Sequence, residues 1–116
     1  MIRTKRVYET PAKEDGYRIL VDRLWPRGLT KERARADIWM KDIAPTAELR
    51  EWFGHQAGKW PEFEKRYRAE LTKKKELLAE LKRLEKVHRT LTLLYGRRDR
   101  KQNQAVVLAA VLKGKK

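Results

Sequence analysis

Two short apolar runs constrain the fold of this chain more than any other feature. Ile19, Leu20 and Val21 are consecutive, and the run TLTLLY at residues 90–95 is similarly apolar. Consecutive apolar residues over so short a stretch indicate a strand that is covered on both faces, as in a parallel sheet. A third, weaker strand is predicted at residues 2–9, where Lys5 and Arg6 suit the edge of a sheet.

The stretches between and after these runs have helical spacing. A long helix is predicted to begin at Pro61, with apolar side chains at helical intervals from Phe63 to Leu84 and a break near 72–75, and residues 105–112 are apolar nearly all round. Thr30, Thr46 and Asn103 stand where N-caps are expected, and the helix after Thr30 is predicted from Lys31 to about Asp37. Strands separated by helices predict a small single α/β domain, residues 1–113, with a short, mostly parallel sheet of three or four strands covered by helices. Residues 114–116 are expected to form a basic tail.

The composition excludes several kinds of site. The chain has 116 residues and no cysteine, which excludes disulfides, thiolate metal sites and a cysteine nucleophile. With only two histidines, no metal site is expected, and no cofactor is predicted. The N-terminus lacks the apolar core of a signal peptide, and no apolar stretch has transmembrane length. We therefore expect a cytoplasmic protein that makes no membrane contact.

The formal net charge is +14, and its distribution along the chain decides how strongly it indicates nucleic-acid binding. Residues 42–63 carry two Lys/Arg against four Asp/Glu, whereas residues 97–116 carry seven Lys/Arg against one Asp. The remaining positive charge is spread over the first 41 residues and over 64–96, including the lysines at 73–75, which are expected on a solvated face. Scattered cations raise affinity for polyanions without forming a specific site, so charge alone is weak support for nucleic-acid binding.

Charged residues and a tryptophan follow the strongest strand directly. The stretch VDRLWPRGL contains Asp22, Arg23, Trp25 and Arg27. Ligands of parallel sheets lie beyond the carboxyl ends of the strands, which is where this loop belongs. One interpretation is an anion pocket, with arginine forks holding the anion and Asp22 orienting them or acting as a base. The other is an internal ion pair between Asp22 and an arginine that fixes the turn.

A second polar loop follows the last strand. Arg98 and Asp99 lie in it, and Asn103 ends it. Arg98 and Asp99 are predicted to converge with the first loop on a ligand, with Asp99 as an alternative base, or else to form a solvated charge cluster. Neither loop matches a known phosphate-binding signature.

The sequence WFGH, at residues 52–55, forms a third candidate cluster. Trp52 is able to stack on a planar ligand, although tryptophan at helical spacing is more often part of a core. His55 follows a glycine that ends a helix, and it is a candidate proton shuttle.

Four stretches together carry a family resemblance. DGYRILVDRLWPRGL, WMKDIAPTAELREWFGH, KWPEFEKRYRAEL and TLLYGRRDRKQNQAVVL resemble, in this order, the YeaO-like branch of the bacterial domain-of-unknown-function family numbered 488. The resemblance implies a small cytoplasmic α/β protein without an established activity. In the family pattern the last loop is close to RDEEHNHAVVL, so Gln102 and Gln104 stand where histidines are expected, and Arg100 and Lys101 replace an acidic pair. General acid–base chemistry that used those histidines is not open to this chain.

The leading functional hypothesis is binding of a small anionic ligand, phosphate-bearing or nucleotide-like, between the loops 22–28 and 96–103. Asp22, Asp99 and His55 are the candidate catalytic groups. The candidate ligand-binding residues are Arg23, Trp25, Arg27, Arg98 and Asn103. One alternative is a nucleic-acid-binding module that uses the basic surface, and another is a structural or interaction domain. The chain is expected to be a monomer or a homodimer.

Overall fold

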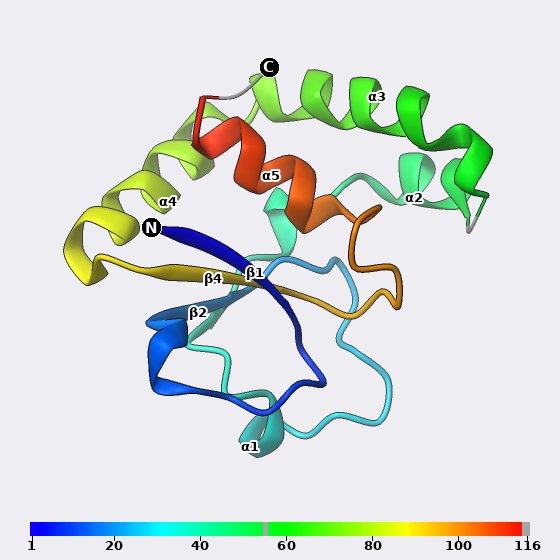
Figure 1. The fold of residues 1–116 in the computed structure, drawn as a ribbon. Coiled ribbons are helices and arrows are strands. Elements are labelled where there is room, and N and C mark those ends of the chain that lie inside the picture. The colour runs from blue at the N-terminus through cyan, green and yellow to red at the C-terminus, as the bar shows by residue number, and fades with distance from the viewer. Residues whose placement is uncertain (55, 115–116) are drawn as a thin grey trace.

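The fold is built on a four-stranded parallel sheet, seen in the computed structural model, which describes residues 1–54 and 56–114 (Figure 1). The strand order is β1-β4-β2-β3, and every pairing is parallel. The strands are β1 (Ile2–Arg6), β2 (Tyr17–Leu20), β3 (Ile38–Trp39) and β4 (Leu91–Tyr95). The predicted α/β class is therefore confirmed, and the first strand lies at an edge of the sheet as expected.

Three helices cover one face of the sheet. They are α3 (Trp60–Thr72), α4 (Lys75–His88) and α5 (Gln104–Leu112), and they form the upper layer of Figure 1. The shorter helices α1 (Lys31–Ala34) and α2 (Ala47–Phe53) lie in the connections before and after β3. None of the described helices is long and apolar enough to cross a membrane.

The two faces of the sheet bury different sets of side chains. Leu91, Leu93 and Tyr95 pack into the main core beneath the helices. Leu94 points the other way, into a smaller core that it shares with Leu20 and Ala34. The connection from β2 to β3 covers this second face. Strand β4 is thus buried along its whole length, which explains its continuous apolar run.

A buried ionic cluster fastens the second face. The guanidinium of Arg18 donates to the carboxylate of Asp15 and to the backbone carbonyls of Ala34 and Arg35. Lys5 on β1 also binds Asp15, at 3.1 Å. Both members of the Asp15–Arg18 pair are almost fully buried, so each compensates the desolvation of the other. The cluster ties two connections and two strands together.

Local signals in the sequence account for most of the helix boundaries. The side chains of Thr30, Thr46 and Asn103 accept the expected hydrogen bonds from backbone amides of the first turn. The predicted break near 72–75 is confirmed, because α3 ends at Thr72 and α4 begins at Lys75.

Three details differ from the expectation. The helix predicted from Lys31 to about Asp37 ends at Ala34, because Arg35 adopts a left-handed conformation with φ of 46°. Lys74 is not on a solvated face, since its ammonium donates to the carbonyl of Ala44 at 2.9 Å. Strand β3 has only two residues, too few to give a sequence pattern.

Candidate ligand-binding site

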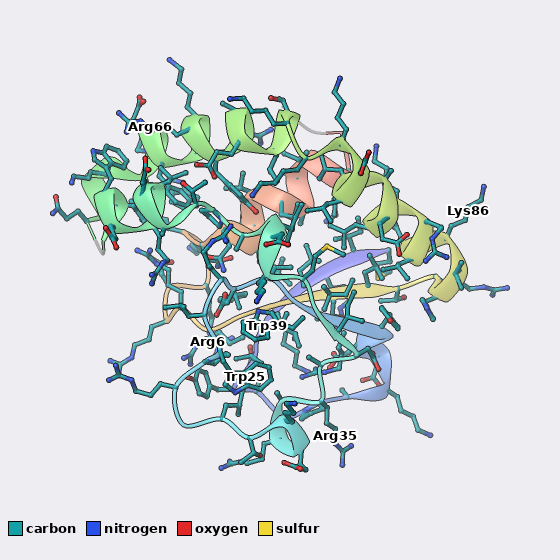
Figure 2. All side chains as sticks on the ribbon, turned by 180° about the vertical axis from the view of Figure 1, so that it is seen from behind. Arg6, Trp25, Arg35, Trp39, Arg66 and Lys86 are labelled. Atoms are coloured by element: carbon teal, nitrogen blue, oxygen red, sulfur yellow. The ribbon has the colours of Figure 1, made fainter. Side chains whose placement is uncertain are left out.

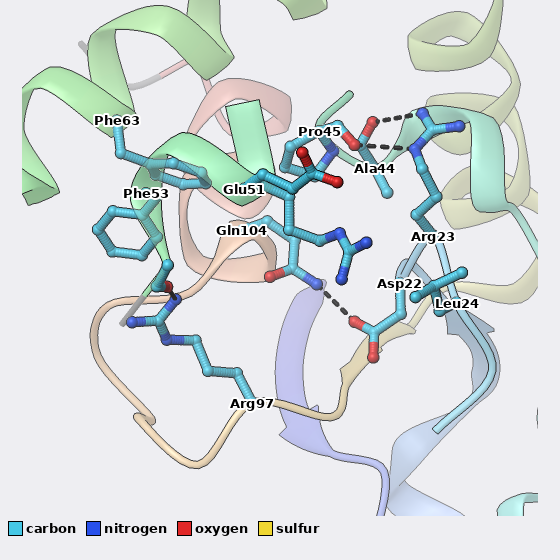
Figure 3. Close-up of a pocket in the computed structure, with 12 residues that line it drawn as sticks. Asp22, Arg23, Leu24, Ala44, Pro45, Glu51, Phe53, Phe63, Arg97 and Gln104 are labelled. Carbon is cyan, nitrogen blue, oxygen red and sulfur yellow. Dashed lines mark hydrogen bonds between the residues drawn. The ribbon is translucent and has the colours of Figure 1, made fainter. Parts of the chain in front are cut away.

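A pocket of about 400 Å³ lies beyond the carboxyl end of β2, between the loop that follows β2, the loop that follows β4, and helix α2 (Figure 3). Its floor and walls combine aromatic, aliphatic and charged groups. The lining residues are Asp22, Arg23, Leu24, Ala44, Pro45, Arg50, Glu51, Phe53, Gly54, Phe63, Arg97 and Gln104. Its size lies in the range of pockets that hold small molecules.

Asp22 is the best-anchored polar group in this pocket. One carboxyl oxygen, Oδ2, accepts the backbone N–H of Gly96 at 2.9 Å, and the other, Oδ1, accepts the side-chain amide of Gln104 at 2.5 Å (Figure 3). Burial raises the pKa of Asp22 to about 6, and the two hydrogen bonds and the charge of Arg50 oppose this shift only partly. A carboxyl group with such a pKa exchanges protons readily near neutral pH.

Arg23 has a structural role at the rim. Its guanidinium donates to the carbonyls of Pro45 and Ala44, at 2.9 and 3.1 Å (Figure 3). No ion pair links Asp22 to an arginine among the described residues, so nothing here supports the alternative of an internal Asp22–arginine pair. Consecutive residues of an extended segment point in different directions, which sends Asp22 towards Gly96 and Arg23 towards the turn before α2.

That turn is held from several sides. The hydroxyl of Tyr67 donates to the carbonyl of Ile43 at 2.7 Å, and both carboxylate oxygens of Glu70 accept hydrogen bonds from Thr46. The turn carries Ala44 and Pro45, so these bonds make one wall of the pocket rigid. Helix α2, which begins at Ala47, is positioned by the same contacts.

Two arginines and two phenylalanines complete the pocket. The Arg97 guanidinium lies 4.4 Å from the ring centroid of Phe53 and donates to the carbonyl of Gly54 at 3.3 Å. Phe53 packs against Phe63 with ring centroids 4.4 Å apart. Arg50 is exposed on α2, and neither it nor Arg97 forms an ion pair with a described residue. Burial lowers the pKa of Arg97, yet the group stays charged at any physiological pH.

The structure places the predicted site residues in different environments. Asp22 and Arg23 line the pocket. Trp25 belongs to the smaller core, where its indole N–H donates to the carbonyl of Leu29 at 2.6 Å. Arg27 and Arg98 are exposed and do not line the pocket.

The other candidates from the second and third clusters also lie apart from the pocket. Asp99 is exposed and accepts the backbone N–H groups of Lys101 and Gln102, both at 2.9 Å. Asn103 caps α5. Trp52 is half-buried, packs against the main core, and carries the cations of Lys59 and Arg66 over its ring. The prediction for His55 lies outside the described residues. Among the residues that the structure describes, no acidic or histidine cluster has the form of a metal site.

Arg50 is a pocket residue that the sequence patterns do not single out, and Gln104 drew attention only through the family pattern. Arg50 lies three positions before Phe53, which puts both on neighbouring turns of α2. Gln104 is the first residue of α5, immediately after the Asn103 cap. Helical spacing and capping therefore contain the signal, but only the packing of α2 and α5 against the end of β2 shows that the two residues meet.

Fold and site together define a small parallel α/β protein with one amphipathic pocket at the carboxyl edge of its sheet. The family model described as "Inactive DUF488-N3 subclade" matches residues 1–116, and the chain belongs to this family. The resemblance to the YeaO-like branch is thereby confirmed.

The relatives are bacterial proteins of unknown function. An uncharacterized protein of Mycobacterium tuberculosis is 43% identical over 114 residues, which cover 98% of this chain and 95% of that protein. The uncharacterized protein YeaO of Escherichia coli is 44% identical over 110 residues, which cover 93% of each chain. No solved structure matches the chain.

Proposed function

We propose that this protein binds a small anionic ligand of nucleotide-like character in the Asp22 pocket, without chemical turnover. The observation that carries the proposal is the combination within one pocket of an apolar aromatic wall, two arginines without ion-pair partners, and a carboxyl group with a raised pKa. Each part matches a different part of such a ligand.

The cationic part favours an anion. Arg50 and Arg97 both line the pocket, and their charges are not neutralised by an ion pair with any described residue. Guanidinium groups hold phosphate and carboxylate oxygens through paired N–H donors. A phosphate is the anion that benefits most from two such groups in one pocket.

The apolar and polar walls favour a heterocyclic body. Leu24 is exposed and supplies apolar surface for a planar ring, and Phe53 and Phe63 also line the pocket, although both phenylalanine rings are almost fully buried. The Asp22 carboxyl retains acceptor positions beyond its bonds to Gly96 and Gln104, because each carboxylate oxygen has two lone pairs. An aromatic heterocycle with N–H donors is complementary to such a carboxyl group. A sugar phosphate has no aromatic heterocycle and would leave the apolar surface of the pocket uncovered.

Two observations favour binding without turnover. The family is described as inactive. In addition, Gln104 occupies the position next to Asp22 where the YeaO-like pattern has a histidine, and a glutamine amide does not exchange protons near neutral pH. The side-chain hydrogen-bond partner of Asp22 is therefore a group that does not relay a proton.

A thermal-shift screen with nucleotides, sugar phosphates and inorganic phosphate tests the proposal. We expect a nucleotide to raise the melting temperature by several degrees, and Arg50→Ala to abolish the shift. Lys86→Ala is the matched control, since it removes one positive charge from an exposed position near the end of α4, outside the pocket. A nucleotide that stabilises the wild type is then incubated with the protein and analysed for products, and none is expected.

The outcomes separate this proposal from its alternatives. If no small anion stabilises the protein, or if Arg50→Ala responds like the wild type, the pocket hypothesis fails. Stabilisation by oligonucleotides alone would favour the nucleic-acid-binding alternative, and a dimer in sedimentation experiments without any ligand response would favour an interaction domain.

A further inference from the structure

Tyr8 is an exposed aromatic residue that the pocket does not use. Its side chain is 43% exposed, and its hydroxyl donates to the backbone carbonyl of Arg27 at 2.8 Å. The guanidinium of Arg6 lies 5.0 Å from its ring centroid. The ring is therefore fixed at both its edge and its face, although a large part of its surface stays in contact with solvent. A rigid, exposed tyrosine beside arginines needs an explanation.

Arg6 also joins Tyr8 to the loop that borders the pocket. Its Nε donates to the carbonyl of Arg97 at 3.0 Å and its Nη2 to the carbonyl of Gly96 at 3.3 Å. Arg97 lines the pocket, and Gly96 binds Asp22. A continuous set of contacts thus runs from the pocket through Arg6 to Tyr8 and on to Arg27. Arg98 and Lys101 lie further along the loop whose first residues bind Arg6. We call the exposed residues Tyr8, Arg27, Arg98 and Lys101 the Tyr8 ridge.

The cations of the Tyr8 ridge are available to a ligand. Arg27, Arg98 and Lys101 are exposed, and none forms an ion pair with a described residue. Two of the nearby acids are already engaged, because Glu9 pairs with Arg100 at 2.8 Å and Asp99 accepts two backbone amides, whereas Glu32 lines the same groove as Tyr8. These three charges come in addition to Arg50 and Arg97 of the pocket. Five cations exceed what one small anion can bind, so the surface suits a ligand with several negative charges.

Open space lies beside the ring. Tyr8 lines a groove of about 400 Å³ with Thr10, Gly28, Leu29 and Arg33, among others. The groove begins next to Arg27 and extends along the connection from β2 to β3. A planar group therefore has access to the tyrosine ring from the solvent.

We propose that the Tyr8 ridge binds single-stranded nucleic acid, with one nucleotide in the Asp22 pocket and a neighbouring base stacked on Tyr8. This inference rests on the proposed function for the pocket nucleotide. Arg27, Arg98 and Lys101 hold the phosphates between and beyond the two bases. An aromatic platform flanked by cations is the arrangement by which proteins bind single strands without sequence preference. In a duplex the faces of the bases are stacked on one another and cannot reach Tyr8. An acidic peptide has no base to stack on Tyr8.

Binding of oligothymidylates of increasing length, compared with thymidine monophosphate, tests the ridge. We expect an oligonucleotide long enough to reach Tyr8 to bind at least tenfold more tightly than the mononucleotide. Tyr8→Leu should weaken oligonucleotide binding about tenfold and leave mononucleotide binding unchanged. Tyr8→Phe keeps the ring and should retain most of the affinity. This second variant separates loss of stacking from any loss of stability, and thermal unfolding of each variant verifies the fold.

Charge reversal provides the second readout. The double variant Arg27→Glu/Arg98→Glu is compared with the double variant Lys82→Glu/Lys86→Glu. The second variant makes the same change of charge on α4. Figure 2 shows Lys86 far from Arg6 and Trp25. Only the ridge variant should weaken oligonucleotide binding strongly. Each phosphate contact that a variant loses should also reduce the slope of log affinity against log salt by about 0.7.

Three results overturn the proposal: oligonucleotides that bind no more tightly than the mononucleotide, an equal loss in the two charge-reversed variants, or polyglutamate that competes as well as the oligonucleotide. Failure of the pocket hypothesis looks different. It appears as mononucleotide binding that is absent or insensitive to Arg50→Ala, whatever the ridge variants do.

Discussion

The backbone amide of Gly96 donates a hydrogen bond to Oδ2 of Asp22 across 2.9 Å, and no side chain fits at position 96 without meeting that oxygen. A Cβ atom on Gly96 would lie 2.8 Å from Asp22 Oδ2 and 3.7 Å from Cβ of Pro26. The glycine thus permits the close approach of the β4 loop to the β2 loop. The two loops meet through this pair of residues.

Gly96→Ala should break this contact. The Asp22 carboxyl must move, which costs about 1–2 kcal/mol of unfolding free energy through the lost hydrogen bond and the crowded methyl group. The pKa of Asp22 should rise further, because the Gly96 amide lowers it in the wild type. Urea unfolding and carboxyl carbon NMR titration measure the two effects. Unchanged values for both would show that the loops do not depend on this contact.

Asp22 should make the stability of the fold depend on pH. Burial raises its pKa to about 6 from an ordinary value of 3.8, so the folded state binds this proton more tightly than the unfolded chain does. The contribution of Asp22 to stability is therefore fully present below about pH 4 and is lost as the pH rises through 6, by at most about 3 kcal/mol.

Asp22→Asn removes this titration. Subtraction of the variant's unfolding free energy from that of the wild type, measured from pH 3.5 to 7.5 in a series of urea unfolding experiments, isolates the contribution of Asp22. The unfolding free energy of the wild type should fall relative to that of Asp22→Asn as the pH rises. A difference that stays flat over this range would contradict the raised pKa.

Arg23 and Arg27 should behave oppositely in stability measurements, although they lie four positions apart in one loop. Arg23→Ala removes two charge-assisted hydrogen bonds to the carbonyls of Ala44 and Pro45 and should cost about 2 kcal/mol. Arg27→Ala removes an exposed side chain that has no partner among the described residues and should cost less than about 0.5 kcal/mol. Chemical denaturation of both variants side by side checks this. Equal losses would mean that the whole loop, and not the Arg23 bonds, supports the turn.

Gly16 and Gly28 separate backbone strain from steric overlap. Both adopt positive φ, 63° and 74°, but a Cβ at Gly16 would lie 2.4 Å from the carbonyl oxygen of Thr90, whereas nothing lies within 4 Å of a Cβ at Gly28. Gly28→Ala should cost about 1 kcal/mol from conformation alone. Gly16→Ala should cost about 3 kcal/mol or more, because the start of β2 must move away from β4. Thermal unfolding of the two variants gives the comparison, and similar melting temperatures would refute the predicted overlap.

Much of the fold follows from local sequence signals. The apolar runs at 19–21 and 91–95 are buried on both faces, the caps at Thr30, Thr46 and Asn103 begin helices, and three lysines mark the end of α3. These features depend on residues that are close in the sequence, because the conformation of a strand or of a helix turn is determined largely by residues a few positions apart. The two-residue strand β3 is too short to carry such a signal.

The candidate site required the tertiary structure. The sequence by itself indicated that Asp22 and the loop after β4 meet above the sheet, because parallel strands bring their carboxyl ends to one edge. Only the packed structure decided that Asp22 turns towards Gly96 and Gln104, that Arg23 fastens the turn before α2, and that Arg50 and Arg97 line the pocket. The physical reason is that these contacts join residues up to 82 positions apart. Their geometry depends on how α2 and α5 pack against the sheet, which no local pattern encodes.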